Sequence, residues 1–368
     1  MPITPDHLRR LLVSQSLFST TTLKRALHRM QFVQADPIRA PARAQDLILR
    51  HRVKDYKAGD LESRYTKLGV EEDFFINYGF VIRELQILMH PRADCRVPAE
   101  NRLPWPAARR KRAHLLLDFV RERGSVHPRE VDEYFSHGKV KNYWGGNSNA
   151  TTHLLDAMHY QGLLRVTRRE AGIRIYAAHE HVDEVLDQAA CDARLDALAD
   201  AAIRIYAPLP LASLRFLLRR LRFAAPQWES RIAAVIQRAK HRLAHAHVEG
   251  TDWYWPGEWK VPRGQPDDVV RLLAPFDPVV WDRWRFEKLW GWAYRFEAYT
   301  PTAKRVRGYY AMPMLWRDQV IGWGNLSVKD DSLQVDFGYV KSTPRDRVFA
   351  QGLEEELERM RTFLGVAS

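Results

Sequence analysis

Cysteine is scarce in this sequence. Cys95 and Cys191 are the only two, and neither belongs to a Cys-x-x-Cys pair or a cysteine–histidine cluster. This pattern argues against a structural zinc site and a disulfide framework, and it fits a reducing cytoplasm. The histidines contain no His-Glu-x-x-His frame; the nearest approach is His241, His245 and His247. We assign these three to a helix end and a strand, with metal binding as the minor alternative. We therefore expect no metal ion and no cofactor.

Long apolar runs are also missing. No stretch approaches the roughly 18 apolar residues of a membrane-spanning helix. The N-terminal MPITPDHLRRLL does not have the basic-then-apolar layout of a signal peptide. We expect a cytoplasmic, nucleoid-associated protein without a membrane segment.

Acidic residues are fewer than basic ones. The chain has 57 Lys and Arg against 45 Asp and Glu, which gives a net charge of +12 at pH 7. Such an excess favours a polyanionic partner, and nucleic acid is the commonest one. The 368 residues, 46% apolar and 28% charged, are an ordinary globular composition. That length suggests about two to four domains.

The spacing of apolar residues predicts an α+β fold. Residues 5–30 predict two amphipathic helices, followed by a short strand and a third helix that ends near Arg52. This order begins a winged-helix unit, and we expect a further helix over 70–90. Three helices and a strand pair over 113–178 predict a second winged helix, and 183–260 repeats the plan.

The character of the chain changes after residue 269. Short strands are predicted at 295–299, 308–312, 320–323, 326–329 and 333–339, followed by a helix from about 344. The predicted fold is therefore a set of tandem winged-helix (helix-turn-helix) modules followed by a C-terminal antiparallel β domain. The expected domains are 1–100, 101–182, 183–262 and 263–368.

The loop before the third helix of the second module is a candidate DNA contact. It carries Lys139, Lys141 and Asn142, followed by an aromatic pair and two glycines. Cations beside a flexible glycine pair suit contact with a phosphate backbone. The alternative is an ordinary loop in which Trp144 packs on the domain.

Residues 32–38 place an amide and a carboxylate close together. Side chains alternate along a strand, so Gln34 and Asp36 would share a face, roughly 6.6 Å apart. Pro37 favours an extended Asp36 and ends the strand. Spacing alone favours an ordinary Asp-Pro turn.

This segment resembles the Gln-x-Asp motif of the AlkZ/YcaQ-like DNA glycosylases, a bacterial family acting on alkylated purines and interstrand crosslinks. Some relatives carry Gln-x-Gln, so the chain is more similar to the YcaQ-type subgroup. Two further stretches, 273–283 and 299–310, resemble the same family. The similarity extends from about residue 5 to 364. Residues 77–80, Asn-Tyr-Gly-Phe, depart from a histidine-containing motif of many relatives.

The resemblance implies a monofunctional DNA glycosylase that hydrolyses the N-glycosidic bond of N7-alkylated purines. Asp36 would stabilise the oxocarbenium ion and orient or deprotonate the attacking water. Gln34 would hold the water or the sugar-phosphate through its amide. A purine alkylated at N7 is already cationic and leaves without protonation, so one carboxylate is enough. The nearest lysine in sequence is Lys54, which disfavours a Schiff-base lyase step.

Several cations are candidate DNA contacts. Arg43 matches an arginine of the family and would pair with a phosphate or with Asp46 on its own helix. For Lys304 and Arg305 two roles are equally open: contact with a phosphate, or a place in a solvated turn. We also predict DNA contacts for Arg50 and Arg52. The implied partner is double-stranded DNA with alkylated or crosslinked purines, bound by a monomer.

Two other functions compete with this hypothesis. Winged helices are used more often for binding than for catalysis, so a non-enzymatic transcription regulator is the alternative. A regulator normally dimerises and reads bases with a basic recognition helix, and the third helix of the second module is not strongly basic. A nuclease would need clustered carboxylates for two metal ions, and the sequence shows none.

Overall fold

The computed structural model describes residues 2–93, 95–98, 101–135, 139–141, 147–182 and 184–367. Two compact units make up the chain. Unit 1 contains Met1–Leu61, Ala199–Arg219 and Ile236–Ser368, and unit 2 contains Glu62–Leu198 and Arg220–Val235. The expected division into four domains remains a prediction. No helix within the described ranges is long and apolar enough to cross a lipid bilayer.

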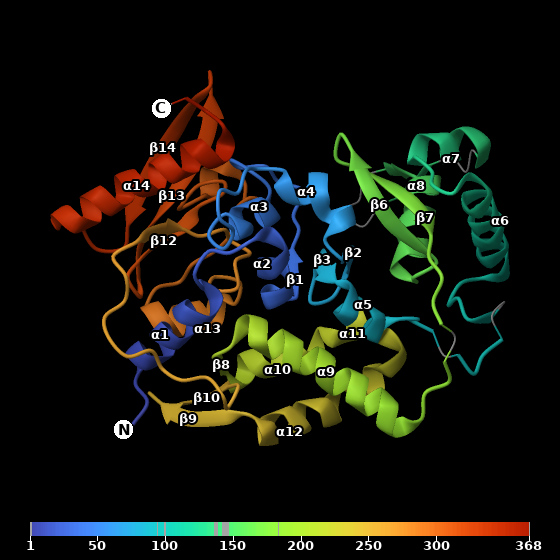
Figure 1. Ribbon diagram of the computed structural model, residues 1–368, viewed down its shortest axis with the longest axis horizontal. Coiled ribbons are helices and arrows are strands. Elements are labelled where there is room, and N and C mark those ends of the chain that lie inside the picture. Colours follow the sequence, from blue (N-terminus) through green and yellow to red (C-terminus); the bar gives the residue numbers. More distant parts are fainter. Residues whose placement is uncertain are drawn as a thin grey trace. The chain divides into compact units, whose positions relative to one another are not determined.

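Helices and strands are interspersed along the chain (Figure 1). The first half contains α1 (Pro5–Ser16), α2 (Leu23–Met30), β1 (Phe32–Gln34), α3 (Ala44–Leu49), α4 (Asp60–Arg64), η1 (Tyr65–Lys67), β2 (Val70–Phe74), β3 (Tyr78–Ile82), α5 (Arg83–Met89), α6 (Ala107–Arg123), α7 (Pro128–Phe135), β4 (Lys139–Lys141), β5 (Asn147–Asn149), α8 (Ala150–Tyr160), β6 (Leu164–Glu170) and β7 (Ile173–Ala178). The second half contains α9 (Gln188–Tyr206), β8 (Leu209–Pro210), α10 (Leu211–Arg219), α11 (Leu221–Ala224), η3 (Pro226–Arg231), α12 (Ile232–Arg242), β9 (Ala244–Val248), β10 (Thr251–Trp255), β11 (Val270–Leu272), α13 (Arg283–Trp290), η4 (Thr302–Lys304), β12 (Met312–Trp316), β13 (Gln319–Lys329), β14 (Ser332–Tyr339) and α14 (Arg347–Leu364).

Two capped helices start unit 1, and they confirm the prediction for residues 5–30. The Thr4 hydroxyl accepts from the His7 backbone N–H at the start of α1. The Thr22 hydroxyl accepts from the Arg25 backbone N–H at the start of α2. Each cap satisfies an N–H group that has no partner within its helix. The buried faces of the two helices are formed by Leu8, Leu11, Leu12, Leu23, Ala26, Leu27 and Met30.

The helix predicted over 70–90 is wrong in its first half. Residues 70–82 form the antiparallel hairpin β2–β3, and only α5 is helical. Glu71, Glu72 and Asp73 are all buried on β2, at 3%, 2% and 2% exposure. Arg165 and Arg169 on β6 pair with Glu71 and Glu72 at 2.7 and 2.6 Å. These long-range ion pairs offset the cost of burying charge in a strand, and local spacing does not reveal them.

The predicted winged-helix modules are present. In unit 2, α6, α7 and α8 are followed by the β6–β7 hairpin, which is the order of three helices and a wing. α9, α10 and α12 are followed by the β9–β10 hairpin, in which Trp253 pairs with Ala246. β8 pairs with the other edge of β10.

The C-terminal part of unit 1 is an antiparallel meander in the order β11-β12-β13-β14. Helix α14 lies across this sheet (Figure 1), and Phe349 of α14 contacts the rings of Trp316 and Tyr339. The two strands predicted at 320–323 and 326–329 are one continuous strand, β13. The strand predicted at 295–299 is wrong, and 308–311 precede β12 without being part of it. The Glu297 carboxylate holds this segment as a loop by accepting hydrogen bonds from backbone N–H groups.

A buried ion pair connects the N-terminal helices of unit 1 to its C-terminal part. Arg52 is fully buried and donates to both carboxylate oxygens of Asp277, at 2.7 and 3.0 Å. Its other donors reach the backbone oxygens of Ser16 and Ile48 at 2.8 and 2.7 Å. A planar guanidinium with bidentate geometry and satisfied donors suits a buried pair.

We predict that Asp277→Ala strongly destabilises the protein. The substitution leaves the Arg52 charge buried without a counter-ion, which costs about 3–5 kcal/mol of unfolding free energy. Urea denaturation measures the loss. The matched control is Glu130→Ala, which removes an exposed partner of Arg123 and should cost less than about 1 kcal/mol. Equal losses in the two variants would contradict the role of the buried pair.

Three histidine rings lie close together in unit 2. The rings of His90 and His181 are parallel at 4.5 Å, and His179 lies 4.1 Å from His181. His90 Nε2 is 2.7 Å from Asp73 Oδ2. Burial lowers the pKa of His90 to about 4, although Asp73 opposes the change. Burial and the neighbouring His181 lower the pKa of His179 to about 3.

We predict that the stability of unit 2 already falls at pH values above those at which ordinary carboxylates are protonated. An unfolded histidine has a pKa of about 6.5, so the unfolded chain binds more protons than the folded chain between that pH and about 4. Stability therefore falls as the pH decreases through this window. Urea midpoints at several pH values measure the effect, and His179→Phe should make the dependence shallower. A pH-independent midpoint, or an unchanged slope in the variant, would contradict the prediction.

Candidate active site

The Gln34–Asp36 segment leaves its strand earlier than predicted. β1 ends at Gln34, so Asp36 lies beyond the strand, and alternation along a strand does not set its direction. Instead, Asp36 Oδ1 accepts from the Ile38 backbone N–H at 2.9 Å. The expected turn at Asp36-Pro37 is therefore present, and it fixes one oxygen of the carboxylate. Gln34 is buried at 7% exposure, whereas Asp36 is half-buried.

The environment of Asp36 favours its neutral form more than water does. Partial burial raises the pKa of the Asp36 carboxyl, and the hydrogen bond from Ile38 opposes the change. The negative charge of Asp36 contributes to the raised pKa values of Tyr299 and Tyr310, although burial is the larger cause for both. Asp36 therefore lies close to two tyrosines of the 299–310 stretch. A raised pKa makes this carboxylate a better proton acceptor than an exposed aspartate.

A cleft of about 650 Å³ opens in unit 1, and its lining begins at Arg39, three residues after Asp36. Its walls are residues 39–41, which follow the Asp36 turn, residues 308–310, and residues 325–328 and 334–336 of the β13–β14 hairpin. The cleft brings together segments of three different parts of the sequence. A concave site with a few polar groups beside an ionisable residue is the usual form of an active site.

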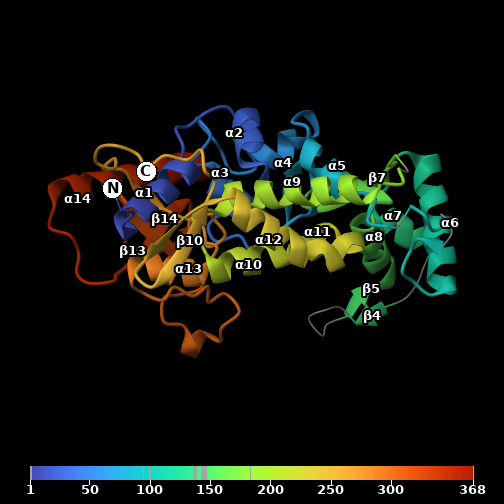
Figure 2. The same cartoon turned by 90° about the horizontal axis from the view of Figure 1, so that it is seen from below.

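The Glu297 carboxylate shapes the loop between α13 and β12. Glu297 is 6% exposed, and its Oε2 accepts from the backbone N–H groups of Val306, Arg307 and Gly308, at 2.9, 2.7 and 3.3 Å. The chain is therefore held as a loop where strands were predicted. Gly308 has φ +111, and a Cβ there would collide with Asn325. In Figure 2 the orange loop after α13 projects away from the sheet.

Aromatic and basic side chains lie on this loop. Tyr299 and Tyr309 are exposed at 68% and 43%. Lys304 is exposed on η4, while Arg305 is half-buried. Arg305 donates to the Thr300 carbonyl at 2.8 Å, and its guanidinium lies 5.1 Å from the centre of the Tyr309 ring. Lys304 is thus the more available of the two predicted phosphate contacts.

Two predicted DNA contacts are wrong. Arg52 is fully buried in its pair with Asp277 and cannot reach a phosphate. The Arg50 side chain is 3% exposed and pairs with Glu356 of α14. The residues that pair with these two arginines, Glu356 and Asp277, are more than two hundred residues away in the sequence.

The other predicted contacts remain predictions. Arg43 is half-buried at the residue before α3. Lys139 and Lys141 lie in β4, which pairs with β5. Asn142 and Trp144 lie outside the described residues. No role was assigned to Glu297 or Tyr310 from the sequence alone. Glu297 lies two residues before the 299–310 stretch that resembles the family, and Tyr310 is its last residue.

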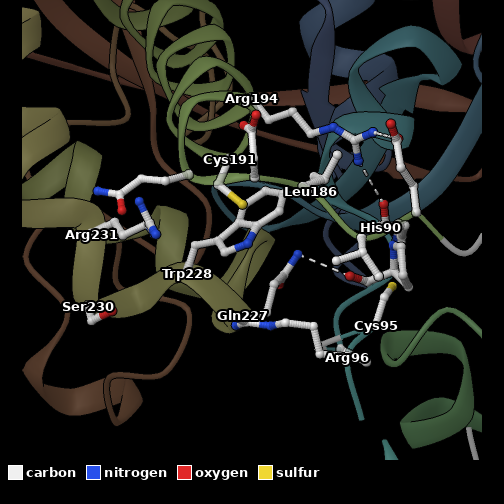
Figure 3. A pocket seen from close by; sticks show the side chains of 16 residues that line it. His90, Cys95, Arg96, Leu186, Cys191, Arg194, Gln227, Trp228, Ser230 and Arg231 are labelled. Carbon is white, nitrogen blue, oxygen red and sulfur yellow. Dashed lines mark hydrogen bonds and ion pairs between the residues drawn. The ribbon is translucent and has the colours of Figure 1, made fainter. Parts of the chain in front are cut away.

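A second cavity, of about 380 Å³, lies within unit 2 (Figure 3). Its lining includes His90, Arg96, Leu186, Gln227 and Trp228, together with both cysteines of the chain. Two of its arginines are engaged in ion pairs: Arg194 with Glu184 at 2.8 Å, and Arg231 with Asp192 at 3.2 Å. None of the predicted site residues lies in this cavity. Across the described part of the chain, no group of three or more His, Cys, Asp or Glu is arranged to hold a metal ion.

Comparison with known proteins identifies the family of the chain. The sequence pattern of the family described as "DNA glycosylase AlkZ-like" matches residues 27–363. Among solved structures, the Streptomyces sahachiroi DNA glycosylase AlkZ is similar in fold, with a TM-score of 0.64 and 14% sequence identity. The match covers 100% of this chain and 98% of that one. The family match decides against a non-enzymatic regulator. The chain belongs to the AlkZ-like DNA glycosylase family and is a DNA glycosylase.

Proposed function

We propose that this glycosylase hydrolyses the N-glycosidic bond of cationic N7-alkylated purines in double-stranded DNA. The observation that supports the proposal is the half-buried Asp36 carboxylate, which is fixed by Ile38 in the turn that leads into the lining of a 650 Å³ cleft at Arg39. Cleavage of this bond builds positive charge at C1′, and a nearby carboxylate stabilises that charge. Asp36 also orients or deprotonates the attacking water.

Gln34 has a supporting role in this proposal. It lies on β1, two residues before Asp36, and its amide both donates and accepts hydrogen bonds. Its burial at 7% exposure limits its reach to groups that enter the site. Gln34 therefore holds the water or the sugar-phosphate without adding charge.

A single carboxylate decides which lesions are substrates. A neutral base needs a second acid to protonate it as it leaves, whereas an N7-alkylated purine already carries the positive charge. Interstrand crosslinks through purine N7 atoms carry the same charge, so the proposal extends to them. The damaged nucleotide must leave the base stack to reach a carboxylate beside a cleft.

We predict that Asp36→Asn lowers base release by at least about 100-fold. Asparagine has nearly the same shape but no charge to stabilise the sugar cation. The assay incubates duplex DNA containing N7-methylguanine with each protein and counts alkali-labile abasic sites. Asp55→Asn is the matched control, because Asp55 is exposed in unit 1 and its φ of 53° is tolerated by asparagine.

Two results would contradict the proposal. Equal base release by the wild type and Asp36→Asn would remove Asp36 from the mechanism. Release of uracil as fast as of N7-methylguanine would show that a cationic leaving group is not required.

We predict that Lys304→Gln weakens DNA binding without sequence preference. Loss of one phosphate contact should reduce the slope of log affinity against log salt by about 1. Fluorescence anisotropy at several salt concentrations measures this slope. The control is Lys288→Gln, which removes an exposed lysine whose ammonium lies over the Trp284 ring. Identical slopes in both variants would exclude phosphate contact by Lys304.

A further inference from the structure

Tyr310 carries a buried hydroxyl that the described structure leaves without a partner. The residue is 2% exposed, and its hydroxyl has no hydrogen-bond partner among the described residues. Buried polar groups in folded proteins are nearly always hydrogen-bonded, because an unpaired one costs free energy. Tyr294 is a useful contrast: it is equally buried, at 1%, and its hydroxyl donates to the Ala311 carbonyl at 2.6 Å.

The ring of Tyr310 is held firmly in place. It meets the ring of Phe296 edge-on, at 5.3 Å and 89°. Phe296 in turn meets Phe276 edge-on at 5.1 Å. Tyr310 also lines the cleft together with Arg39, which follows Asp36 by three residues. Aromatic packing thus fixes Tyr310 in the lining of the cleft, to which the segment after Asp36 also contributes.

Asp36 is the anion beside this hydroxyl. Its charge, after burial, is the largest contribution to the raised pKa of Tyr310, ahead of Tyr294, Arg283 and Tyr299. Arg283 is fixed by donating to the carbonyls of Val280 and Pro275, at 2.6 and 2.8 Å. The tyrosines stay neutral and Arg283 stays charged near neutral pH. Asp36 is therefore the one group of this set that changes its charge in acid.

We propose that Tyr310 is a positioning residue, whose hydroxyl donates a hydrogen bond to the Asp36 carboxylate once DNA occupies the cleft. This inference rests on the proposed function of Asp36. Ile38 holds Oδ1 of the carboxylate, and Tyr310 then holds the other oxygen. Two donors orient the carboxylate toward the sugar and keep it ionised while DNA excludes water from it.

The test compares Tyr310→Phe with Tyr294→Phe. The first substitution removes an unpaired hydroxyl, so the melting temperature should not fall, while single-turnover base release should fall by roughly tenfold. The acidic limb of its pH–rate profile should move to higher pH, because Asp36 loses a donor that favours its charged form. Tyr294→Phe breaks a formed hydrogen bond, so it should lower the melting temperature and leave the acidic limb unmoved.

A double-mutant cycle decides whether Tyr310 acts through Asp36. If it does, adding Tyr310→Phe to Asp36→Asn should cost nothing further. An additional tenfold loss, or a rate loss in the single variant without a shifted acidic limb, would overturn the inference. If only Asp36→Asn is impaired, the proposed function stands and the role of Tyr310 is wrong. If both single variants match the wild type, the proposed function itself is wrong.

Discussion

The charge pair between Arg52 and Asp277 holds together the part of the protein that contains the candidate site. The two residues are 225 positions apart, and both side chains are fully buried. An arginine keeps its proton at any physiological pH, so it is buried only where a carboxylate and carbonyls satisfy it. The pair fixes the helices before and after the Asp36 turn against the segment that leads into α13. The two sides of the cleft thereby belong to one compact unit.

Packing and hydrogen bonds then bring the chemistry to the cleft. Glu297 gathers three backbone N–H groups and makes residues 297–308 a loop. Phe276 and Phe296 hold the Tyr310 ring beside the Asp36 turn. None of these residues needs to touch DNA to matter. They place one carboxylate, with its pKa raised by burial, where a sugar cation would form.

Unit 2 is organised by charge in a different way. Its β2 strand buries carboxylates that pair with arginines of β6, and burial lowers the pKa values of His90 and His179. The spacing of apolar residues over 70–90 predicts a helix, because such spacing depends only on neighbours in the chain. A strand with consecutive buried acids is stable only when the basic strand lies beside it, and that is a property of the tertiary structure.

The sequence by itself determined the two N-terminal helices, the winged-helix modules and the Gln34–Asp36 motif. Those features depend on apolar spacing, capping residues and turn residues, which act over a few positions. Only the tertiary structure decided that Arg50 and Arg52 are structural, that residues 295–311 form a loop, and that Tyr310 lies beside Asp36. Burial and pairing depend on segments hundreds of residues away. The local sequence around an arginine therefore does not show whether its side chain contacts DNA or a buried carboxylate.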